Sequence, residues 1–286
     1  MTLPAPDAET TVVGIIGHPI RHSLSPLLYN TAFAALGLNW VMQAFEVAPG
    51  AAAGALVGMR ALGIAGLSVT MPHKSDVAAA VDDRSDVAER LGAVNCVVNR
   101  NGVLWGTNTD GAGFLASLER GAGFELSGAR CVVIGAGGAA RAVILALAEG
   151  GAQEIAVVNR TAERAEVAAA LAGRAGRVIA PSDQGEVMAT AAQAQLVVNA
   201  TPVGMNVATG EEEWLVAPGH LHAGQVAADL VYVPRPTPWL LAAASEGATT
   251  VDGLGMLVHQ AAVQFELWTG SAAPLEAMWQ AAVESV

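Results

Sequence analysis

The chain has 286 residues, of which 53% are hydrophobic and 14% are charged, so it is globular rather than disordered. Its formal net charge of −12 argues against nucleic acid and anionic membrane surfaces as partners, because both attract basic patches. No apolar run reaches the roughly 18 residues that a membrane-spanning helix requires.

Short β-branched runs alternate with alanine-rich helical stretches, a pattern that predicts an α/β fold. In the first part of the chain we expect strands at 11–16, 41–47 and 67–70, a hairpin with strands at 95–99 and 103–107, and helices at 26–36, after Pro49, from His73 or Lys74, and at 110–119. The hairpin turn contains Asn101-Gly102, a residue pair that tight two-residue turns favour.

The second part begins with the continuous apolar run 130–134, which is typical of a strand buried in a parallel sheet. A glycine loop and a helix through Glu149 follow. Further strands are expected at 154–158, 196–199, 226–229 and 249–251, and further helices at 162–171, 238–246, 255–269 and 275–284. This order indicates an N-terminal α/β domain at 1–110, completed by helices at 251–286, and a Rossmann-type domain at 111–250. The active site is expected in the cleft between the two domains.

Lys74 is the only lysine among the 14 basic residues of the chain. It follows a strand end and a turn forced by Pro72, and open α/β sheets bind ligands at the carboxyl ends of their strands. An ammonium group can give up its proton, whereas a guanidinium group retains it. Lys74 is therefore a candidate general acid and base. The alternative is an ordinary solvated lysine.

A glycine-rich loop, Gly135-Ala136-Gly137-Gly138-Ala139-Ala140, lies between a predicted strand and a predicted helix. In this context the pattern predicts a dinucleotide-binding turn, with small residues and helix amides close to the pyrophosphate.

The next strand ends in Asn159-Arg160-Thr161, with Arg164 one helical turn later. An acidic residue, which would bind the ribose hydroxyls of NAD, is absent from this position. Two guanidinium groups suit a 2′-phosphate, so the sequence favours NADP. The alternative is that both arginines face solvent at the start of a helix.

Other polar residues follow predicted elements of the N-terminal part. Ser23 and Ser25 precede a helix with Pro26 near its start, where they form either an N-cap or a cradle for a carboxylate. Asp110 is either a helix cap or a carboxylate that holds the ammonium group of Lys74.

Taken in order, these motifs resemble the shikimate dehydrogenase family over nearly the whole chain. Three later segments add to the resemblance: Asn199–Met205, Asp229–Tyr232 and Gly253–Gln260. The resemblance implies an NADP-linked oxidoreductase of chorismate and aromatic amino acid biosynthesis. It would reduce 3-dehydroshikimate to shikimate by hydride transfer from NADPH, with Lys74 donating a proton.

The resemblance also implies roles for the matching residues, and no metal. Lys74 and Asp110 are expected to be catalytic. The residues expected to bind substrate are Ser23, Ser25, Thr70, Asn95, Asp110, Tyr232 and Gln260. The residues expected to bind the cofactor are Gly135, Ala136, Gly137, Gly138, Ala139, Asn159, Arg160, Thr161, Arg164, Thr201, Leu230, Gly253 and Met256.

One departure bears on the substrate. The family usually has Asn where this chain has Ser68, which is shorter and offers one donor instead of two. An NAD-dependent paralogue acting on quinate, shikimate or an aminated ring is therefore an alternative. A non-catalytic NADP-sensing module is a second one.

The remaining expectations concern the cellular setting. Cys96 and Cys131 lie in separate apolar runs, which favours buried thiols over a disulfide or a metal site. The first residues lack a basic region followed by an apolar one, so we expect no signal peptide and a cytoplasmic location. We expect a monomer or a homodimer whose partner is a small-molecule substrate.

Overall fold

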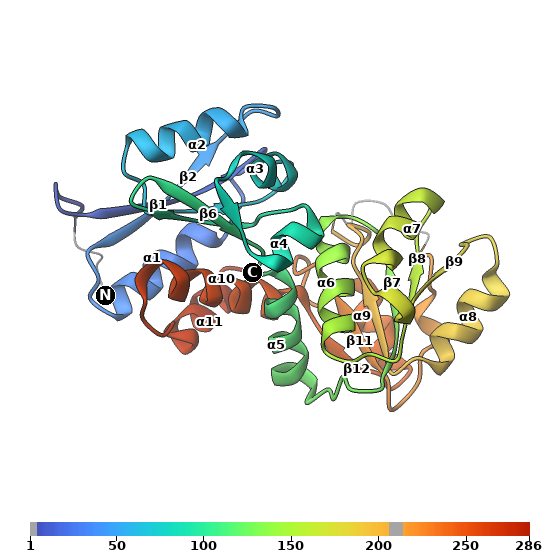
Figure 1. Cartoon of the computed structure of the whole chain (residues 1–286). Coiled ribbons are helices and arrows are strands. Elements are labelled where there is room, and N and C mark those ends of the chain that lie inside the picture. Colours follow the sequence, from blue (N-terminus) through green and yellow to red (C-terminus); the bar gives the residue numbers. More distant parts are fainter. Residues whose placement is uncertain (1–4, 206–213) are drawn as a thin grey trace. The chain divides into compact units, whose positions relative to one another are not determined.

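The computed structural model describes residues 5–205 and 214–286. The chain folds into two compact units (Figure 1). The first runs to Thr109 and is completed by Val258–Ser285, and the second is Asp110–Leu257. The second division falls at residue 258, inside a helix, whereas the limit expected from the sequence was residue 251. In the described part of the chain, no helix is both long enough and apolar enough to cross a bilayer.

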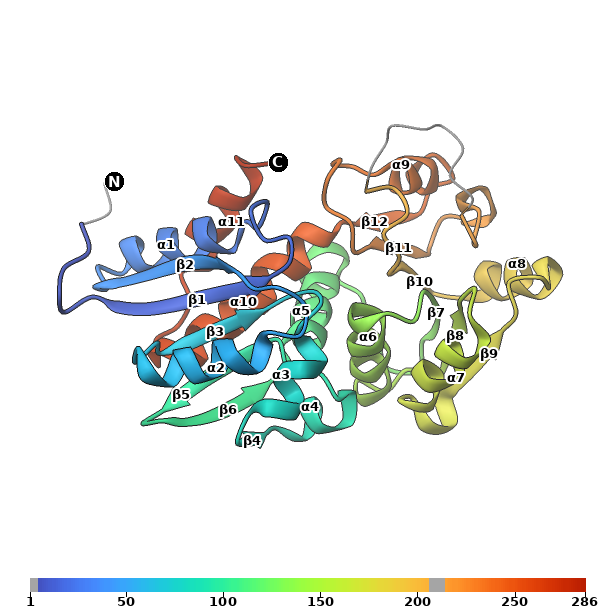
Figure 2. The same cartoon turned by 90° about the horizontal axis from the view of Figure 1, so that it is seen from above.

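The sheet of the first unit is mixed, with the strand order β2–β1–β3–β5–β6–β4 (Figure 2). Strand β1 is parallel to both β2 and β3, whereas β5 is antiparallel to both β3 and β6. The strand bounds are β1 Thr11–Gly17, β2 Trp40–Glu46, β3 Gly66–Val69, β4 Asp83–Arg84, β5 Cys96–Arg100 and β6 Val103–Thr107. Because β1 and β3 are parallel neighbours, the loops that follow them leave the same edge of the sheet.

Helices cover both faces of this sheet, with α2 and α3 on one face and α1, α10 and α11 on the other (Figure 1). Their bounds are α1 Ser25–Ala35, α2 Ala52–Ala61, α3 Lys74–Ala80, α4 Asp86–Leu91, α10 Gly253–Thr269 and α11 Leu275–Val283. Aromatic side chains fill the core beneath α10, where Tyr29 packs on Trp268 and Phe33 stacks on Phe265. Residues after Val258 therefore complete a core that the N-terminal residues begin.

The turn between β5 and β6 confirms the predicted hairpin. Asn101 has a φ of 55° and Gly102 a φ of 91°, so both residues occupy the left-handed region. Two-residue hairpin turns of this type need two such residues, which explains why asparagine and glycine occur together here.

The sheet of the second unit is entirely parallel, with the strand order β12–β11–β10–β7–β8–β9. Its strands are β7 Arg130–Ile134, β8 Glu154–Val158, β9 Gly176–Ile179, β10 Leu196–Asn199, β11 Val226–Asp229 and β12 Thr249–Val251. This is the strand order of a doubly wound dinucleotide-binding fold, and it confirms the predicted fold class.

Helices also cover both faces of this second sheet (Figure 2). They are α5 Asp110–Ala122, α6 Gly138–Glu149, α7 Ala162–Ala170, α8 Gln184–Gln193 and α9 Pro238–Ser245. Side chains alternate along β7: Cys131 and Val133 join the core under α5, α6 and α7, whereas Val132 and Ile134 join the core under α8 and α9. The continuous apolar run of β7 follows from this burial on both sides.

Two pairs of elements were not predicted: β4 with α4, and β9 with α8. Both helices carry start signals in the sequence. The Ser85 hydroxyl accepts a hydrogen bond from the Ala88 N–H at 3.2 Å, and the Asp183 carboxylate accepts one from the Glu186 N–H at 3.0 Å. Gly92 ends α4 in the left-handed region. These side chains match ordinary helix caps, which could have revealed both helices.

Candidate functional site

The predicted glycine loop connects β7 to α6 in the second unit. Gly135 has a φ of 109°, and a side chain there would come within 3.0 Å of the Ala200 carbonyl oxygen. At Gly137 and Gly138 an added Cβ would meet no atom within 4 Å, so the start of α6 is open. Its first N–H groups receive no side-chain cap. A helix start of this kind provides donors and positive potential for a phosphate group.

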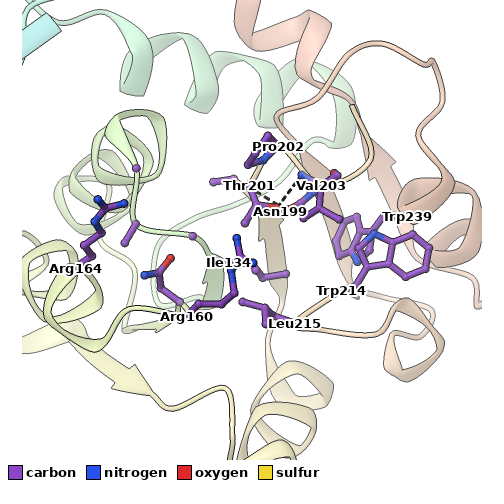
Figure 3. A pocket seen from close by; sticks show the side chains of 15 residues that line it. Ile134, Arg160, Arg164, Asn199, Thr201, Pro202, Val203, Trp214, Leu215 and Trp239 are labelled. Atoms are coloured by element: carbon purple, nitrogen blue, oxygen red, sulfur yellow. Dashed lines mark hydrogen bonds between the residues drawn. The ribbon is translucent and has the colours of Figure 1, made fainter. Parts of the chain in front are cut away.

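A pocket of about 290 Å³ lies beside this loop (Figure 3). The loops after three neighbouring parallel strands, β7, β8 and β10, contribute its lining. It brings together seven of the residues predicted to bind a cofactor: Gly135, Ala136, Gly137, Asn159, Arg160, Arg164 and Thr201. The carboxyl ends of adjacent strands are where doubly wound sheets bind ligands.

The loop after β8 and the first turn of α7 supply the positive charge of this pocket through Arg160 and Arg164. Arg160 and Arg164 are exposed, and neither guanidinium forms an ion pair with another residue in 5–205 or 214–286. The Asn159 side chain donates a hydrogen bond to the Thr161 carbonyl oxygen at 2.9 Å, which braces the turn into α7. Two unneutralised guanidinium groups at one end of a pocket favour an anionic ligand group.

A buried web of hydrogen bonds supports the opposite wall. The Asn199 amide donates to the Asp229 carboxylate at 3.0 Å, and its oxygen accepts from the Thr201 hydroxyl at 2.7 Å. The Thr237 hydroxyl donates to the same carboxylate at 2.7 Å. Burial raises the pKa of Asp229, although these donors oppose the shift. The web joins the ends of β10 and β11 and so fixes the position of Thr201.

Three apolar residues that line the pocket, Trp214, Leu215 and Trp239, lie outside every predicted motif. Figure 3 shows Arg164 on one side of the pocket and both tryptophans on the other. The Trp239 indole donates to the Val216 carbonyl oxygen at 3.1 Å and anchors the segment that carries Trp214 and Leu215. No local motif marks this segment, so only the tertiary fold reveals its role.

The other predicted cofactor residues border the pocket lining or lie further along the unit. Gly138 and Ala139 begin α6, and Thr161 precedes α7. Gly253 begins α10 and packs so closely on the Leu230 carbonyl group that a Cβ there would overlap it. Met256 follows on the same helix. The pocket therefore does not bring Gly138, Ala139, Thr161, Leu230, Gly253 or Met256 into its lining.

In the first unit, Ser23 lies on the loop after β1, Ser25 is the first residue of α1, and Thr70 lies on the loop after β3. The residue that precedes α1 is Leu24, and no side chain caps this helix, so neither serine is its N-cap. The Ser23 hydroxyl instead accepts the Ser25 N–H at 3.3 Å. A Cβ on Gly17 would come within 2.5 Å of the Thr70 side chain, so the glycine lets these two loops approach each other.

The two predicted catalytic residues both begin helices. Lys74 is the first residue of α3 and is partly exposed, and its carbonyl oxygen accepts the Val94 N–H at 2.9 Å. Asp110 is the first residue of α5 and is 6% exposed. A carboxylate in the first turn of a helix is favourable by itself, so its position also fits a structural role.

A buried polar cluster joins β5, β6 and α10 in the first unit. The Asn95 side-chain oxygen accepts the Thr109 N–H at 2.8 Å, and its amide donates to the Thr109 hydroxyl at 3.1 Å. The Gln264 amide donates to the Gln260 side-chain oxygen at 2.8 Å and accepts from the Tyr29 hydroxyl at 2.9 Å. The cluster connects Asn95 and Gln260, two predicted substrate residues, although Tyr29 and Gln264 were not predicted.

Tyr232 lies after β11 in the second unit and is partly buried. Desolvation raises the pKa of its hydroxyl, so the group remains protonated and can donate a hydrogen bond.

Three family models match successive parts of the chain. The shikimate dehydrogenase substrate-binding domain matches residues 15–97, the shikimate/quinate 5-dehydrogenase model matches 117–235, and the shikimate 5′-dehydrogenase C-terminal domain matches 253–283. Two similar proteins are named shikimate dehydrogenase (NADP(+)). The one from Methanopyrus kandleri is 48% identical, with 97% of each chain covered. The one from Moorella thermoacetica is 47% identical, with 95% of this chain and 92% of the relative covered.

Solved structures give the same match. Shikimate 5-dehydrogenase from Listeria monocytogenes, in complex with shikimate and NAD, has a TM-score of 0.89 at 36% identity and covers 96% of both chains. The enzyme from Thermus thermophilus, in complex with NADP(H) and shikimate, has a TM-score of 0.85 at 36% identity and covers 97% of this chain and 100% of its own.

Proposed function

The chain belongs to the shikimate dehydrogenase family, and we propose that it reduces 3-dehydroshikimate to shikimate with NADPH. One observation carries the proposal most directly. The pocket after β7, β8 and β10 combines an open glycine-lined helix start with two guanidinium groups that form no ion pair among the described residues 5–205 and 214–286.

The residues of this pocket fit NADP. The N–H groups at the start of α6 would bind the pyrophosphate, and the absence of a Cβ at Gly137 and Gly138 leaves room for it. Arg160 and Arg164, with Asn159 and Thr161, would bind the 2′-phosphate. When bound, the coenzyme supplies the hydride. Thr201, Leu230, Gly253 and Met256 would contact its nicotinamide half.

In the proposed mechanism the chain supplies the proton. Lys74 would donate it to the ketone oxygen as negative charge develops there, and would accept it in the reverse direction. Asp110 would hold the Lys74 ammonium group in place. A positioned acid of this kind is typically worth about 10²–10⁴ in rate. Both residues begin helices, so backbone hydrogen bonds hold each main chain in position.

Substrate orientation would be the task of the remaining predicted residues: Ser23, Ser25, Thr70, Asn95, Tyr232 and Gln260. We infer that residues 1–110, completed by 251–286, form the substrate-binding and catalytic domain, and that 111–250 form the NADP-binding domain. Ser25 and Asn95 are buried and therefore held in fixed positions. Fixed polar groups align a substrate for transfer, and misalignment by about 1 Å can cost on the order of 10²-fold in rate.

The decisive experiment is an absorbance assay of the purified protein with shikimate and with quinate, each with NADP⁺ and with NAD⁺. We expect the highest kcat/KM with shikimate and NADP⁺. A preference for NAD⁺ would contradict the role of Arg160, and a preference for quinate or an aminated ring would favour the paralogue. Binding of NADP⁺ without turnover would favour a sensing module. Gel filtration and cell fractionation test the proposed monomer or homodimer and its cytoplasmic location.

A further inference from the structure

We propose that Gln264 and Tyr29 are positioning residues that fix which end of the Gln260 amide faces the substrate. The proposal rests on the proposed function, because it takes Gln260 as a substrate contact. It assigns a role to two residues that do not themselves touch substrate.

Backbone groups determine which way the Gln264 side-chain amide points. The Gln264 nitrogen lies 3.3 Å from the Asn95 backbone carbonyl oxygen, which can only accept a hydrogen bond. The NH₂ end of Gln264 must therefore point toward Asn95, and its oxygen must point toward the Tyr29 hydroxyl. Both Gln264 and Tyr29 are fully buried, so neither can exchange these partners for water.

Tyr29 holds this orientation from the other side. Burial raises its pKa well above the usual range, so the hydroxyl stays protonated and donates to the Gln264 oxygen. Its ring packs on Trp268, with 5.0 Å between the ring centroids, and this contact restricts its movement. An amide flip of Gln264 would place its oxygen against the Asn95 carbonyl oxygen, which is unfavourable.

The orientation passes from Gln264 to Gln260. Because the Gln264 NH₂ group donates to the Gln260 side-chain oxygen at 2.8 Å, that oxygen is held inside the protein. The NH₂ end of a primary amide lies opposite its oxygen, so Gln260 directs its donors the other way.

Thr109, and not Gln264, orients the Asn95 side chain. The Thr109 backbone N–H, which can only donate, lies 2.8 Å from the Asn95 side-chain oxygen. The Thr109 hydroxyl in turn lies 3.2 Å from the Gln260 backbone carbonyl oxygen. The Gln260 amide thus keeps its oxygen inside and directs its NH₂ end away from Gln264, whereas the Asn95 amide donates to the Thr109 hydroxyl at 3.1 Å. Such a site binds ring oxygens, which accept hydrogen bonds, and opposes an ammonium substituent, which can only donate.

The test uses Gln264→Glu, which keeps the size of the side chain but replaces the NH₂ donor that faces Gln260 with an acceptor oxygen. An ionised carboxylate would attract the NH₂ end of Gln260 and turn its oxygen toward the substrate. Burial raises a carboxyl pKa, so lowering the pH restores an O–H donor in the original direction. We expect calorimetry to show shikimate binding about tenfold weaker than wild type near pH 9, from about one lost hydrogen bond, and close to wild type near pH 6. The KM for NADP⁺ should not change.

Two further variants keep the test decisive if Gln264→Glu folds poorly. Gln264→Met removes the polar contacts without reversing them, so it should weaken shikimate binding about three- to tenfold at every pH and reduce discrimination against an aminated ring. Gln280→Glu, an exposed glutamine on α11 of the same unit, is the matched control and should behave as wild type.

Unchanged shikimate binding in Gln264→Glu and Gln264→Met would overturn the proposal. Weaker binding in Gln264→Glu that does not recover at low pH would also overturn it, because general packing damage does not depend on protonation. If wild-type protein itself fails to turn over shikimate, the proposed function fails instead, and the two failures are distinguishable.

Discussion

The two units present their polar residues in different ways. In the second unit, most of the pocket lining comes from the segments directly after β7, β8 and β10, and each of these is a local motif. In the first unit, the buried cluster joins Asn95 to Gln264 across 169 residues and Tyr29 to Gln264 across 235 residues. A nucleotide phosphate can thus be bound by the backbone amides at a strand–helix turn together with arginines from the next turn along the sheet. A site that distinguishes ring substituents depends on tertiary contacts.

The largest expected effect comes from replacing Lys74, the proposed acid of the first unit, which should slow the reaction without affecting the second unit. Lys74→Met should lower kcat by about 10²–10⁴, because no other group would donate the proton, and should leave the dissociation constant of NADPH unchanged. Lys74→Arg keeps the charge but cannot release a proton, so it should be nearly as slow. Stopped-flow hydride transfer and fluorescence titration measure the two quantities. A near-normal rate in either variant would refute the role of Lys74.

The next effect concerns only the second unit. Arg160→Ala should weaken NADPH binding about 10- to 100-fold, since a charge-assisted hydrogen bond to the 2′-phosphate is worth about 1.5–3 kcal/mol, and should change NADH binding little. Arg174→Ala, an exposed arginine after α7, is the control. Equal losses for the two coenzymes would mean that Arg160 does not bind the phosphate.

The third expected effect is a change of stability in the first unit, where Gly66 packs against Trp268. A Cβ on Gly66 in β3 would overlap the Trp268 indole, whose N–H donates to the Val97 carbonyl oxygen at 3.0 Å. Gly66→Ala should therefore cost about 1–3 kcal/mol in the free energy of unfolding. A Cβ added at Gly54 in α2 would meet no atom within 4 Å. Gly54→Ala should therefore raise the free energy of unfolding by about 0.4–1 kcal/mol. Urea unfolding measures both, and changes of the same sign would contradict the packing described for α10.

The smallest expected effect is a pH dependence of stability that comes from buried thiols, Cys96 in the first unit and Cys131 in the second. Burial raises the pKa of Cys131 to about 12 and raises that of Cys96 further. A thiol in the unfolded chain has a pKa of about 8.5. Because the pKa in the folded protein is higher, the thiol contributes its full stabilisation below about pH 8.5, and this contribution declines as the pH rises toward the folded-state pKa. The unfolding free energy of the wild type should therefore fall as the pH rises above about 8.5. In Cys131→Ala this fall should be less steep, by at most about 1.4 kcal/mol per pH unit. An unaltered pH slope would indicate that the thiol ionises in the folded state.

Local patterns predicted most strands, most helices and the glycine loop because each depends on neighbouring residues, whereas β4 and β9 were missed. Helices α4 and α8 were missed although Ser85 and Asp183 cap them, so that information was present in the sequence. Trp214 and the Tyr29–Gln264 pair are different. Their surroundings come from segments far apart in the sequence, and an indole or an amide in an apolar run has no local signature of function.

Helix α10 has a consequence for how the protein is made. Its residues from Val258 onward complete the core of the first unit, whereas the second unit is one continuous stretch of chain. During synthesis, the N-terminal segment must wait until residues after Val258 have left the ribosome before Tyr29 can meet Gln264. At elongation rates of about 5–20 residues per second, the middle of the chain has time to fold first. The later-synthesised unit would thus be the earlier one to mature, the reverse of the usual vectorial order.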